Sequence, residues 1–312
     1  MRIAALVILL SAPVLAQDPA AQTAALRAML QAAPKVPLEQ SALKPIAPQP
    51  GWEIAMVSWI AADKNGLIYL LQRGDKADPI IVMNRDGKVV RSWGKGMFTM
   101  PHAIRIDPKG NVWTTDAASS MVYKFSADGK KLMEITIGGQ PSPCPNNFCS
   151  TTDIAFARDG HLFISDGYRN ARILEYTADG KKLREWGAAG AGPGQFRLPH
   201  SIQIDENDII YVADRENGRI QRFDREGKFL GEWNQYGKTF GITLDKGAIW
   251  LATQPRDLPN SSPGWLIKLD RKTGAILGYV ESESNHGMAV LANGELLQAP
   301  GPKQVPQIYK RR

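Results

Sequence analysis

The chain has 312 residues, enough for one large closed domain, and a formal net charge of +7. Hydrophobic residues make up 43% and charged residues 22%, a balance that is ordinary for a globular protein and excludes an intrinsically disordered chain. The basic excess is modest and dispersed, with no stripe of Lys and Arg interleaved with aromatic residues, so no nucleic-acid partner is expected.

The first residues have the features of a secretory signal. Arg2 supplies a positive charge, residues 3–10 are apolar, and Val14-Leu15-Ala16 offers a cleavage position, which predicts a signal peptide over residues 1–16. The apolar run is too short to span a bilayer as a helix, and no later segment reaches that length. The protein is therefore expected to be exported, either to the periplasm or out of the cell; an uncleaved anchor is the alternative.

Residues 17–50 are rich in Ala, Pro and Gln and are interpreted as a linker. Ala20 to Gln31 can form a short helix, whereas the five prolines that follow disfavour regular structure over most of the remainder. One extended stretch, near Val36 to Ile46, remains as a candidate strand.

From residue 51 onward the sequence repeats itself six times. Each unit begins with an apolar strand, and further short strands follow, separated by turn pairs such as Asp159-Gly160 and Asp128-Gly129. One equivalent position in the first strand of each unit, here called the column, holds in order Ser58, His102, Thr152, His200, Phe240 and His286. Its spacings of 44, 50, 48, 40 and 46 residues suit units of four short strands.

Six such units predict an all-β fold, a six-bladed β-propeller over residues 51–312 with four-stranded antiparallel blades. The last unit lacks a fourth strand, so the stretch near Val36 to Ile46 is expected to supply it and close the ring. An open solenoid is the alternative, but it would leave two sheet edges uncovered.

Three of the four histidines, His102, His200 and His286, fall in the column, in alternate units. The first strand of a propeller blade lines the central channel, and alternate blades of six lie about 120° apart. The three imidazoles are therefore predicted to converge on one metal ion that keeps open positions for water or substrate. Zinc is the expected ion, although iron, nickel or copper would suit the same ligands. Three separate channel-lining histidines are the alternative.

Polar residues near the column complete a candidate active site. Arg73 and Arg215 each lie fifteen residues after it, and Tyr168 lies sixteen after it. Two guanidinium groups beside a metal suit an anionic substrate. A tyrosine near a metal and an arginine loses its proton more readily than its reference pKa of about 10 suggests, so Tyr168 can act as a general base. A structural role in bracing a turn is the alternative for each residue.

The other residues that recur between the repeat units are interpreted as structural. The aspartates at the end of the second strands, such as Asp116, are expected to cap turns, and the tryptophans that end the fourth strands are expected to pack between blades. His161 follows a turn and is expected at the surface. Cys144 and Cys149, five residues apart in a proline-rich loop, suit a local disulfide in an exported protein but not a zinc site.

With these residues in place, the sequence resembles the NHL-repeat propellers, and among them the peptidyl-α-hydroxyglycine α-amidating lyases. The similarity runs through most of residues 52–290. The stretches that carry it are LLQRGD, MPHAIRIDPKGNVWTTD, NNFCSTTDIAF, ISDGYRNARI, GPGQFRLPHS and YVADRENGRIQRF.

The resemblance implies a zinc-dependent lyase that splits a peptidyl-α-hydroxyglycine into a peptide amide and glyoxylate. The three column histidines would be the zinc ligands. Tyr168 would take the proton of the substrate hydroxyl, Arg73 would stabilise the tyrosinate, and Arg215 would lie near the substrate. The partner would be a small molecule or peptide with an anionic group, and a monomer is expected.

The chain also departs from the family pattern. The family has a structural calcium held by two backbone carbonyls, matched here by Ile60 and Ile104, and by an aspartate. Gly287 stands in the place of that aspartate, so the charged oxygen ligand is missing. Arg169 replaces a cysteine that follows the family's tyrosine, so any disulfide must differ, as Cys144–Cys149 would.

Two other functions remain open from the sequence. One is a different metal-assisted hydrolase or lyase acting in the same channel. The other is a non-catalytic NHL propeller that binds a glycan, a peptide or a protein, because a propeller scaffold by itself settles no activity.

Overall fold

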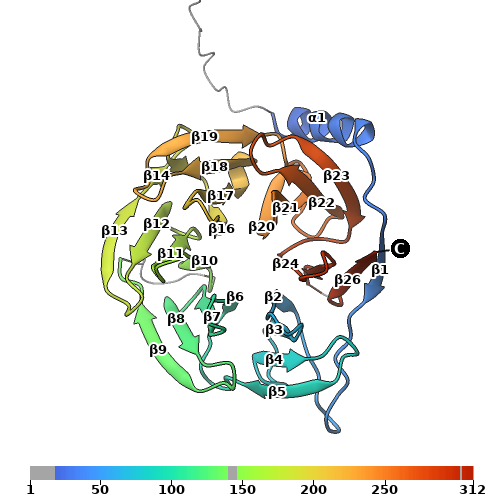
Figure 1. The fold of residues 1–312 in the computed structure, drawn as a ribbon, viewed down its shortest axis with the longest axis vertical. Helices are drawn as coiled ribbons and strands as arrows, with labels where there is room; N and C mark the ends of the chain where they lie inside the picture. The colour runs from blue at the N-terminus through green and yellow to red at the C-terminus, as the bar shows by residue number, and fades with distance from the viewer. Residues whose placement is uncertain (1–17, 140–145, 303, 312) are drawn as a thin grey trace, which may run out of the picture.

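Six four-stranded sheets stand around a central axis in the computed structural model, which describes residues 18–139, 146–302 and 304–311 (Figure 1). Each sheet is antiparallel, and its first strand lies at the axis while its fourth lies at the rim. The predicted fold class, an all-β six-bladed propeller, is confirmed. The expected signal peptide, residues 1–16, lies outside the described residues.

The strands follow the sequence repeat. The first three blades are β2 (Val57–Ala62), β3 (Ile68–Gln72), β4 (Ile80–Met83) and β5 (Val89–Trp93); β6 (Pro101–Ile106), β7 (Val112–Asp116), β8 (Met121–Phe125) and β9 (Lys131–Thr136); and β10 (Thr151–Phe156), β11 (Leu162–Asp166), β12 (Arg172–Tyr176) and β13 (Lys182–Trp186). The last three are β16 (Pro199–Ile204), β17 (Ile210–Asp214), β18 (Arg219–Phe223) and β19 (Phe229–Asn234); β20 (Lys238–Asp245), β21 (Ala248–Gln254), β22 (Gly264–Asp270) and β23 (Ile276–Ser282); and β24 (Gly287–Val290), β25 (Leu296–Ala299) and β26 (Gln307–Arg311), completed by β1 (Leu38–Ala42).

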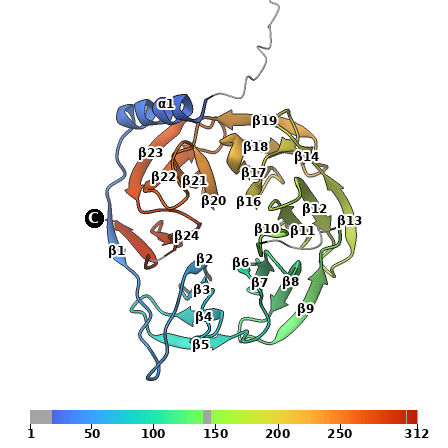
Figure 2. The ribbon, with the colours of Figure 1, turned by 180° about the vertical axis from the view of Figure 1, so that it is seen from behind.

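The sixth blade takes its outer strand from the N-terminal side of the repeats. β1 pairs antiparallel with β26, and the register runs from Leu38 opposite Arg311 to Ala42 opposite Gln307 (Figures 1 and 2). This pairing confirms that an N-terminal strand closes the ring. Closure removes the free edge that an open array of blades would expose.

One helix packs on the outside of the ring. α1 (Pro19–Ala32) begins after Asp18, whose carboxylate accepts a hydrogen bond from the Ala20 amide at 3.3 Å, and Pro19 suits the first helical position because it has no amide to leave unpaired. α1 lies beside β23 at the rim (Figure 2). Its buried side chains Leu26 and Leu30 join the apolar cluster between the fourth and fifth blades. No helix in the described part of the chain is both long and apolar enough to cross a membrane.

Tryptophans at the ends of outer strands pack against the turns of the next blade, as the repeats indicated. A Cβ at Gly129, where φ is +96°, would lie 2.9 Å from the Trp93 ring, and one at Gly227 would lie 2.7 Å from the Trp186 ring. These turns therefore need glycine for two reasons, the positive φ and the flat indole pressed against them.

Short connections complete the ring near the site. β14 (Ala188–Ala189) and β15 (Gln195–Phe196) form a small parallel pair between the third and fourth blades, and the 3-10 helix η1 (Arg215–Asn217) follows β17. η1 places Arg215 at the end of a blade's second strand, beside the axis.

A β-bulge turns each column residue of the first five blades toward the axis. Between Pro199 and Ser201, for example, the register of β16 against β17 shifts so that His200 has no direct partner. The same shift occurs in the innermost strand of the other four blades, at Ser58, at His102, at Thr152 and at Phe240. Bulges of this kind re-aim single side chains, and here they aim the column into the channel.

Candidate metal centre

The three histidines of the column meet at the axis. His102 lies in β6, His200 in β16, and His286 directly before β24; their side chains are buried, and His102 and His200 have no exposed surface. Their ligand nitrogens all lie within 4.8 Å of one another, and their ring centroids are 4.8–5.1 Å apart. The structure therefore brings the predicted ligands together around one point.

A ring of backbone carbonyls holds the three imidazoles. The Nδ1 atom of each histidine lies 2.6–2.7 Å from the backbone oxygen of the column residue in the next blade. The pairs are His102 with Thr152, His200 with Phe240, and His286 with Ser58. Because each Nδ1–H donates to a carbonyl, each Nε2 carries a lone pair that faces the axis, which is the arrangement a metal ligand needs.

Burial keeps the imidazoles neutral. It holds the pKa values of His102 and His200 well below the usual 6.5 and lowers the pKa of His286 to about 3. Nearby positive groups add to the effect, Arg215 for His200 and Arg73 for His286. Neutral imidazole is the form that binds a metal, so the site needs no deprotonation before binding at neutral pH.

Tyr168 points into the same space. Its hydroxyl lies 2.8 Å from Nε2 of His102 and 3.3 Å from Nε2 of His200. Burial raises its pKa above 10, although the charges of Arg215 and Arg73 act in the opposite direction. The two arginines therefore do not bring the pKa of Tyr168 below its ordinary value, and the proton loss expected from the sequence does not follow from them alone.

Arg73 is held in place but keeps one donor free. Its Nε donates to the Pro101 carbonyl at 3.0 Å, and its guanidinium stacks over Phe148 at 5.4 Å. Its Nη2 atom is buried and has no hydrogen-bond partner among the described residues. A buried guanidinium nitrogen without a partner is costly, so this atom is suited to an anionic ligand.

Arg215 lies on the other side of the opening. Its Nε donates to Glu216 at 2.8 Å, and its guanidinium stacks over Phe240 at 4.7 Å. A cavity of about 480 Å³ opens above the histidines and is lined by both arginines, by Tyr168 and by apolar side chains that include Met56 and Phe240. A third arginine, Arg169, also lines the cavity, which thus combines three cations, a hydroxyl and an apolar wall.

Some contributors to this site were missed in the sequence. The carbonyl ring is formed by Ser58, Thr152 and Phe240, which occupy the column but carry no metal-binding side chain. Their regular alternation with the histidines was the signal that could have identified them. The cavity wall also includes Phe148 and Asn285, for which no repeated position gave a signal.

The residues present do not fit a calcium ion. Among residues 18–139, 146–302 and 304–311, the three histidines are the one group of three or more His, Cys, Asp or Glu side chains close enough to hold a metal. Ile60 and Ile104 lie in β2 and β6 as expected, but a Cβ at Gly287 would lie 2.6 Å from the Trp59 ring. Because Trp59 fills that space, no aspartate can approach from Gly287, and the calcium site implied by the resemblance is not formed.

The other polar residues of the repeat have structural contacts. The Asp116 carboxylate accepts hydrogen bonds from four backbone amides, including Thr99 at 2.7 Å and Ser119 at 2.8 Å. His161 lies away from the axis with its Nδ1 atom 2.8 Å from Glu175. Cys149 is buried, and Cys144, its expected disulfide partner, lies outside the described residues.

The chain is similar to known proteins over most of its length. A family model described as a 6-bladed beta-propeller matches residues 146–299. The probable peptidyl-alpha-hydroxyglycine alpha-amidating lyase pgal-1 of Caenorhabditis elegans is 35% identical over 283 residues, which cover 78% of this chain and 79% of that protein. Peptidyl-glycine alpha-amidating monooxygenase A of Xenopus laevis is 34% identical over 223 residues, which cover 67% of this chain but only 24% of that longer protein.

Solved structures show the same fold at lower identity. A streptogramin B lyase structure superposes with a TM-score of 0.61 and 17% identity, covering 88% of this chain and 98% of that one. At this identity the likeness supports the propeller fold and nothing about activity.

Proposed function

Because this chain belongs to the peptidyl-α-hydroxyglycine α-amidating lyase family, we propose that it cleaves the N–Cα bond of a peptidyl-α-hydroxyglycine and releases an amide and glyoxylate. The observation that carries the proposal is the position of the Tyr168 hydroxyl, 2.8 Å from Nε2 of His102 inside a cavity that three arginines line. A base, a metal-binding triad and cations then surround one small space, as removal of a proton from an anionic α-hydroxy compound requires.

His102, His200 and His286 would hold the metal ion, which we propose to be zinc. Three neutral imidazoles with open positions beside them are a usual catalytic zinc ligand set. The bound ion would act as a Lewis acid that lowers the pKa of an adjacent hydroxyl. The carbonyl ring fixes the imidazole tautomers and so prepares the chain for the ion.

The two arginines would bind the carboxylate of the substrate. Arg73 brings a buried Nη2 without a partner, and Arg215 is anchored by Glu216 and Phe240. A carboxylate accepts hydrogen bonds from guanidinium groups with strong geometric preference, so the pair would orient the α-carbon toward Tyr168.

Tyr168 would both accept and return the one proton that the reaction moves. The tyrosinate accepts the proton of the substrate hydroxyl, the oxygen lone pair forms the carbonyl of glyoxylate, and the bond between the α-carbon and the amide nitrogen breaks. The departing nitrogen needs one proton, which is the number that Tyr168 has accepted. The apolar wall of the cavity, formed in part by Met56 and Phe240, would limit water near these charges.

The direct test is glyoxylate release by zinc-loaded protein from a peptide that ends in α-hydroxyglycine. The control substrate is the same peptide ending in glycine, which lacks the hydroxyl that Tyr168 would deprotonate. We expect one glyoxylate per amide from the first peptide and none from the second. Absence of release from the hydroxyglycine peptide by fully zinc-loaded protein would overturn the proposal.

We also propose that the chain is exported by the segment 1–16. The support is the charged and apolar pattern of that segment and the small residue at its end. N-terminal sequencing of the protein from a secretion-competent bacterial host tests this: a chain beginning at Gln17 supports export, and an intact N-terminus contradicts it.

A further inference from the structure

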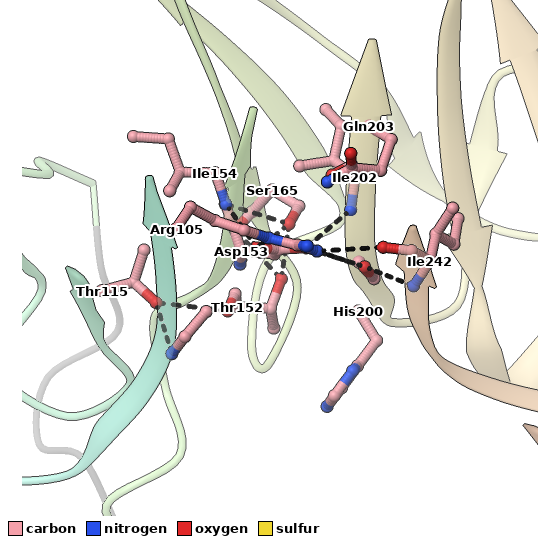
Figure 3. A network of polar contacts seen from close by, with 12 residues as sticks. Arg105, Thr115, Thr152, Asp153, Ile154, Ser165, His200, Ile202, Gln203 and Ile242 are labelled. Carbon is pink, nitrogen blue, oxygen red and sulfur yellow. Dashed lines mark hydrogen bonds and ion pairs between the residues drawn. The ribbon is translucent and has the colours of Figure 1, made fainter. Parts of the chain in front are cut away.

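Beneath the histidines, on the side away from the cavity, a buried ion pair lies on the axis. The Arg105 guanidinium binds Asp153 through two hydrogen bonds, Nε to Oδ1 at 2.9 Å and Nη2 to Oδ2 at 2.6 Å (Figure 3). Asp153 has no exposed surface and Arg105 is only 8% exposed. Neither residue stands in the column: Arg105 follows it by three positions and Asp153 by one.

The pair connects four blades. Arg105 comes from β6 and Asp153 from β10, while Nη2 of Arg105 also donates to the Ile242 carbonyl of β20 at 3.2 Å. The hydroxyl of Ser201, in β16, donates to Asp153 at 2.7 Å and accepts from the Ile242 amide at 3.1 Å. We call Arg105, Asp153 and Ser201 the arginine layer, and His102, His200 and His286 the histidine layer.

The two layers share their supports. The Arg105 guanidinium stacks on the Trp59 ring at 5.0 Å, and the same ring lies 5.9–6.3 Å from each of the three imidazoles. Thr152, whose carbonyl accepts from His102, directly precedes Asp153 in β10. In Figure 3 the His200 imidazole lies to one side of the Arg105–Asp153 pair and is not hydrogen-bonded to it. A shift of the ion pair would therefore move Trp59, which packs against the three imidazoles, and the Thr152 carbonyl, which belongs to the carbonyl ring of the metal centre.

The Asp153 carboxylate has no vacant oxygen for another cation. Besides Arg105 and Ser201, its oxygens accept from the Ile154 amide at 2.9 Å and the Ile202 amide at 3.1 Å. A calcium ion needs six to eight oxygen ligands, at least some of them charged. The Asp153 carboxylate is instead saturated by a side-chain cation, a hydroxyl and two backbone amides.

We propose that Arg105 is the resident cation of the propeller axis: its guanidinium takes the place of a divalent structural ion and positions the three histidines through Trp59 and Asp153. Two consequences follow. The folded protein gains nothing from calcium, and removal of Arg105 loosens the metal site although it touches neither metal nor substrate. The second consequence rests on the proposed metal centre, whereas the first does not.

The test compares wild type with Arg105→Ala by thermal unfolding of the metal-free protein and by zinc affinity measured against a competing chelator. Calcium chloride should leave the melting temperature of wild type unchanged. Arg105→Ala should melt lower and bind zinc about 10- to 100-fold more weakly, as loss of support for metal ligands does elsewhere. Millimolar ethylguanidinium, which fits the space that the side chain leaves, should restore both properties.

Two further variants control this test. Arg271→Ala breaks ion pairs with Glu206 and Asp205 away from the histidines, so it should lower the melting temperature without changing zinc affinity. If Arg105→Ala does not fold, the double variant Arg105→Met with Asp153→Leu removes both charges together and should bind zinc at least tenfold more weakly than wild type.

A rise in the melting temperature of wild type with calcium would contradict the proposal that Arg105 replaces the ion. Unchanged zinc affinity in the folded Arg105 variants would contradict the positioning role. Failure of the proposed lyase activity would appear separately, as wild-type protein that binds zinc but releases no glyoxylate.

Discussion

The histidine layer and the arginine layer lie on the same inner strands, yet their polar groups are used in opposite ways. In the arginine layer both carboxylate oxygens of Asp153 accept hydrogen bonds from donors within the chain. In the histidine layer the Nδ1 atoms are paired with backbone carbonyls, whereas the Nε2 atoms face the axis, where those of His102 and His200 meet the Tyr168 hydroxyl. The nearby Nη2 of Arg73 has no partner among the described residues.

The difference shows how hydrogen-bond accounting separates a binding site from a structural site in one channel. Both layers are buried and both carry charged or titratable groups, so burial alone does not distinguish them. A saturated network stabilises the fold, whereas groups held rigidly but left open are available for a ligand. Substitutions around the histidine layer should therefore change catalysis with little loss of stability, whereas those in the arginine layer should first lower stability and, for Arg105, zinc affinity.

The largest expected effect is that of Tyr168→Phe, next to the histidine layer. Loss of the hydroxyl removes the proposed base, so kcat for glyoxylate release should fall by about 10² to 10⁴, the usual contribution of a general base. Zinc content and melting temperature should stay close to wild type, because the ring remains. A variant that retains most of its kcat would show that Tyr168 is not the base.

Arg73→Met should give the next largest effect. Loss of a charged hydrogen bond to the substrate carboxylate, worth about 1.5–3 kcal/mol, should lower kcat/KM by roughly 10- to 100-fold. The matched control is a substrate whose carboxylate is a carboxamide, for which wild type and variant should differ little. Equal losses on both substrates would argue that Arg73 shapes the site without contacting the carboxylate.

Ser201→Ala tests the arginine layer, whose hydrogen bonds are all made within the chain. The change leaves Asp153 and the Ile242 amide each short of one hydrogen bond, so the free energy of unfolding should drop by about 1–3 kcal/mol. Since Ser201 contacts Arg105, Asp153 and Ile242 and does not line the cavity, kcat should change less than twofold. A large loss of kcat with unchanged stability would reverse the assignment of the two layers.

The last effect concerns pH and is small within any single pH unit. The pKa of His286 is about 3 in the folded, metal-free chain against 6.5 as its ordinary value, so the unfolded chain binds a proton in this window and the folded chain does not. Stability of metal-free protein should therefore fall as the pH decreases from about 6.5 toward 3. His286→Gln should make this fall shallower by up to about 1.4 kcal/mol per pH unit in denaturant titrations. Parallel pH profiles for the two proteins would contradict the depressed pKa.

The repeat pattern was sufficient to predict the fold and the side chains of the histidine layer. Strand order, turn pairs and the missing outer strand of the last unit are local features, so they predicted the propeller and its closure by residues near Val36 to Ile46. The column placed the histidines because equivalent positions of a closed ring must face the same axis.

The arginine layer was not predicted, because its members occupy non-equivalent positions. Arg105 pairs with Asp153 of the next blade and reaches across the channel to the Ile242 carbonyl of β20, and no sequence spacing reports such contacts. The positions directly after the column held a partial signal, since Trp59, Asp153 and Ser201 all lie there. The carbonyl ring left no side-chain signature at all, because the backbone supplies it.

The central claim is that the column histidines form one metal site, and metal analysis of purified protein tests it most directly. Wild type should contain about one zinc per chain, the stoichiometry of a single three-histidine site. His161→Ala should retain that zinc, because His161 lies off the axis beside Glu175, whereas His200→Ala should lose it. Zinc retained by His200→Ala, or no zinc in wild type even after zinc is added back, would contradict the account.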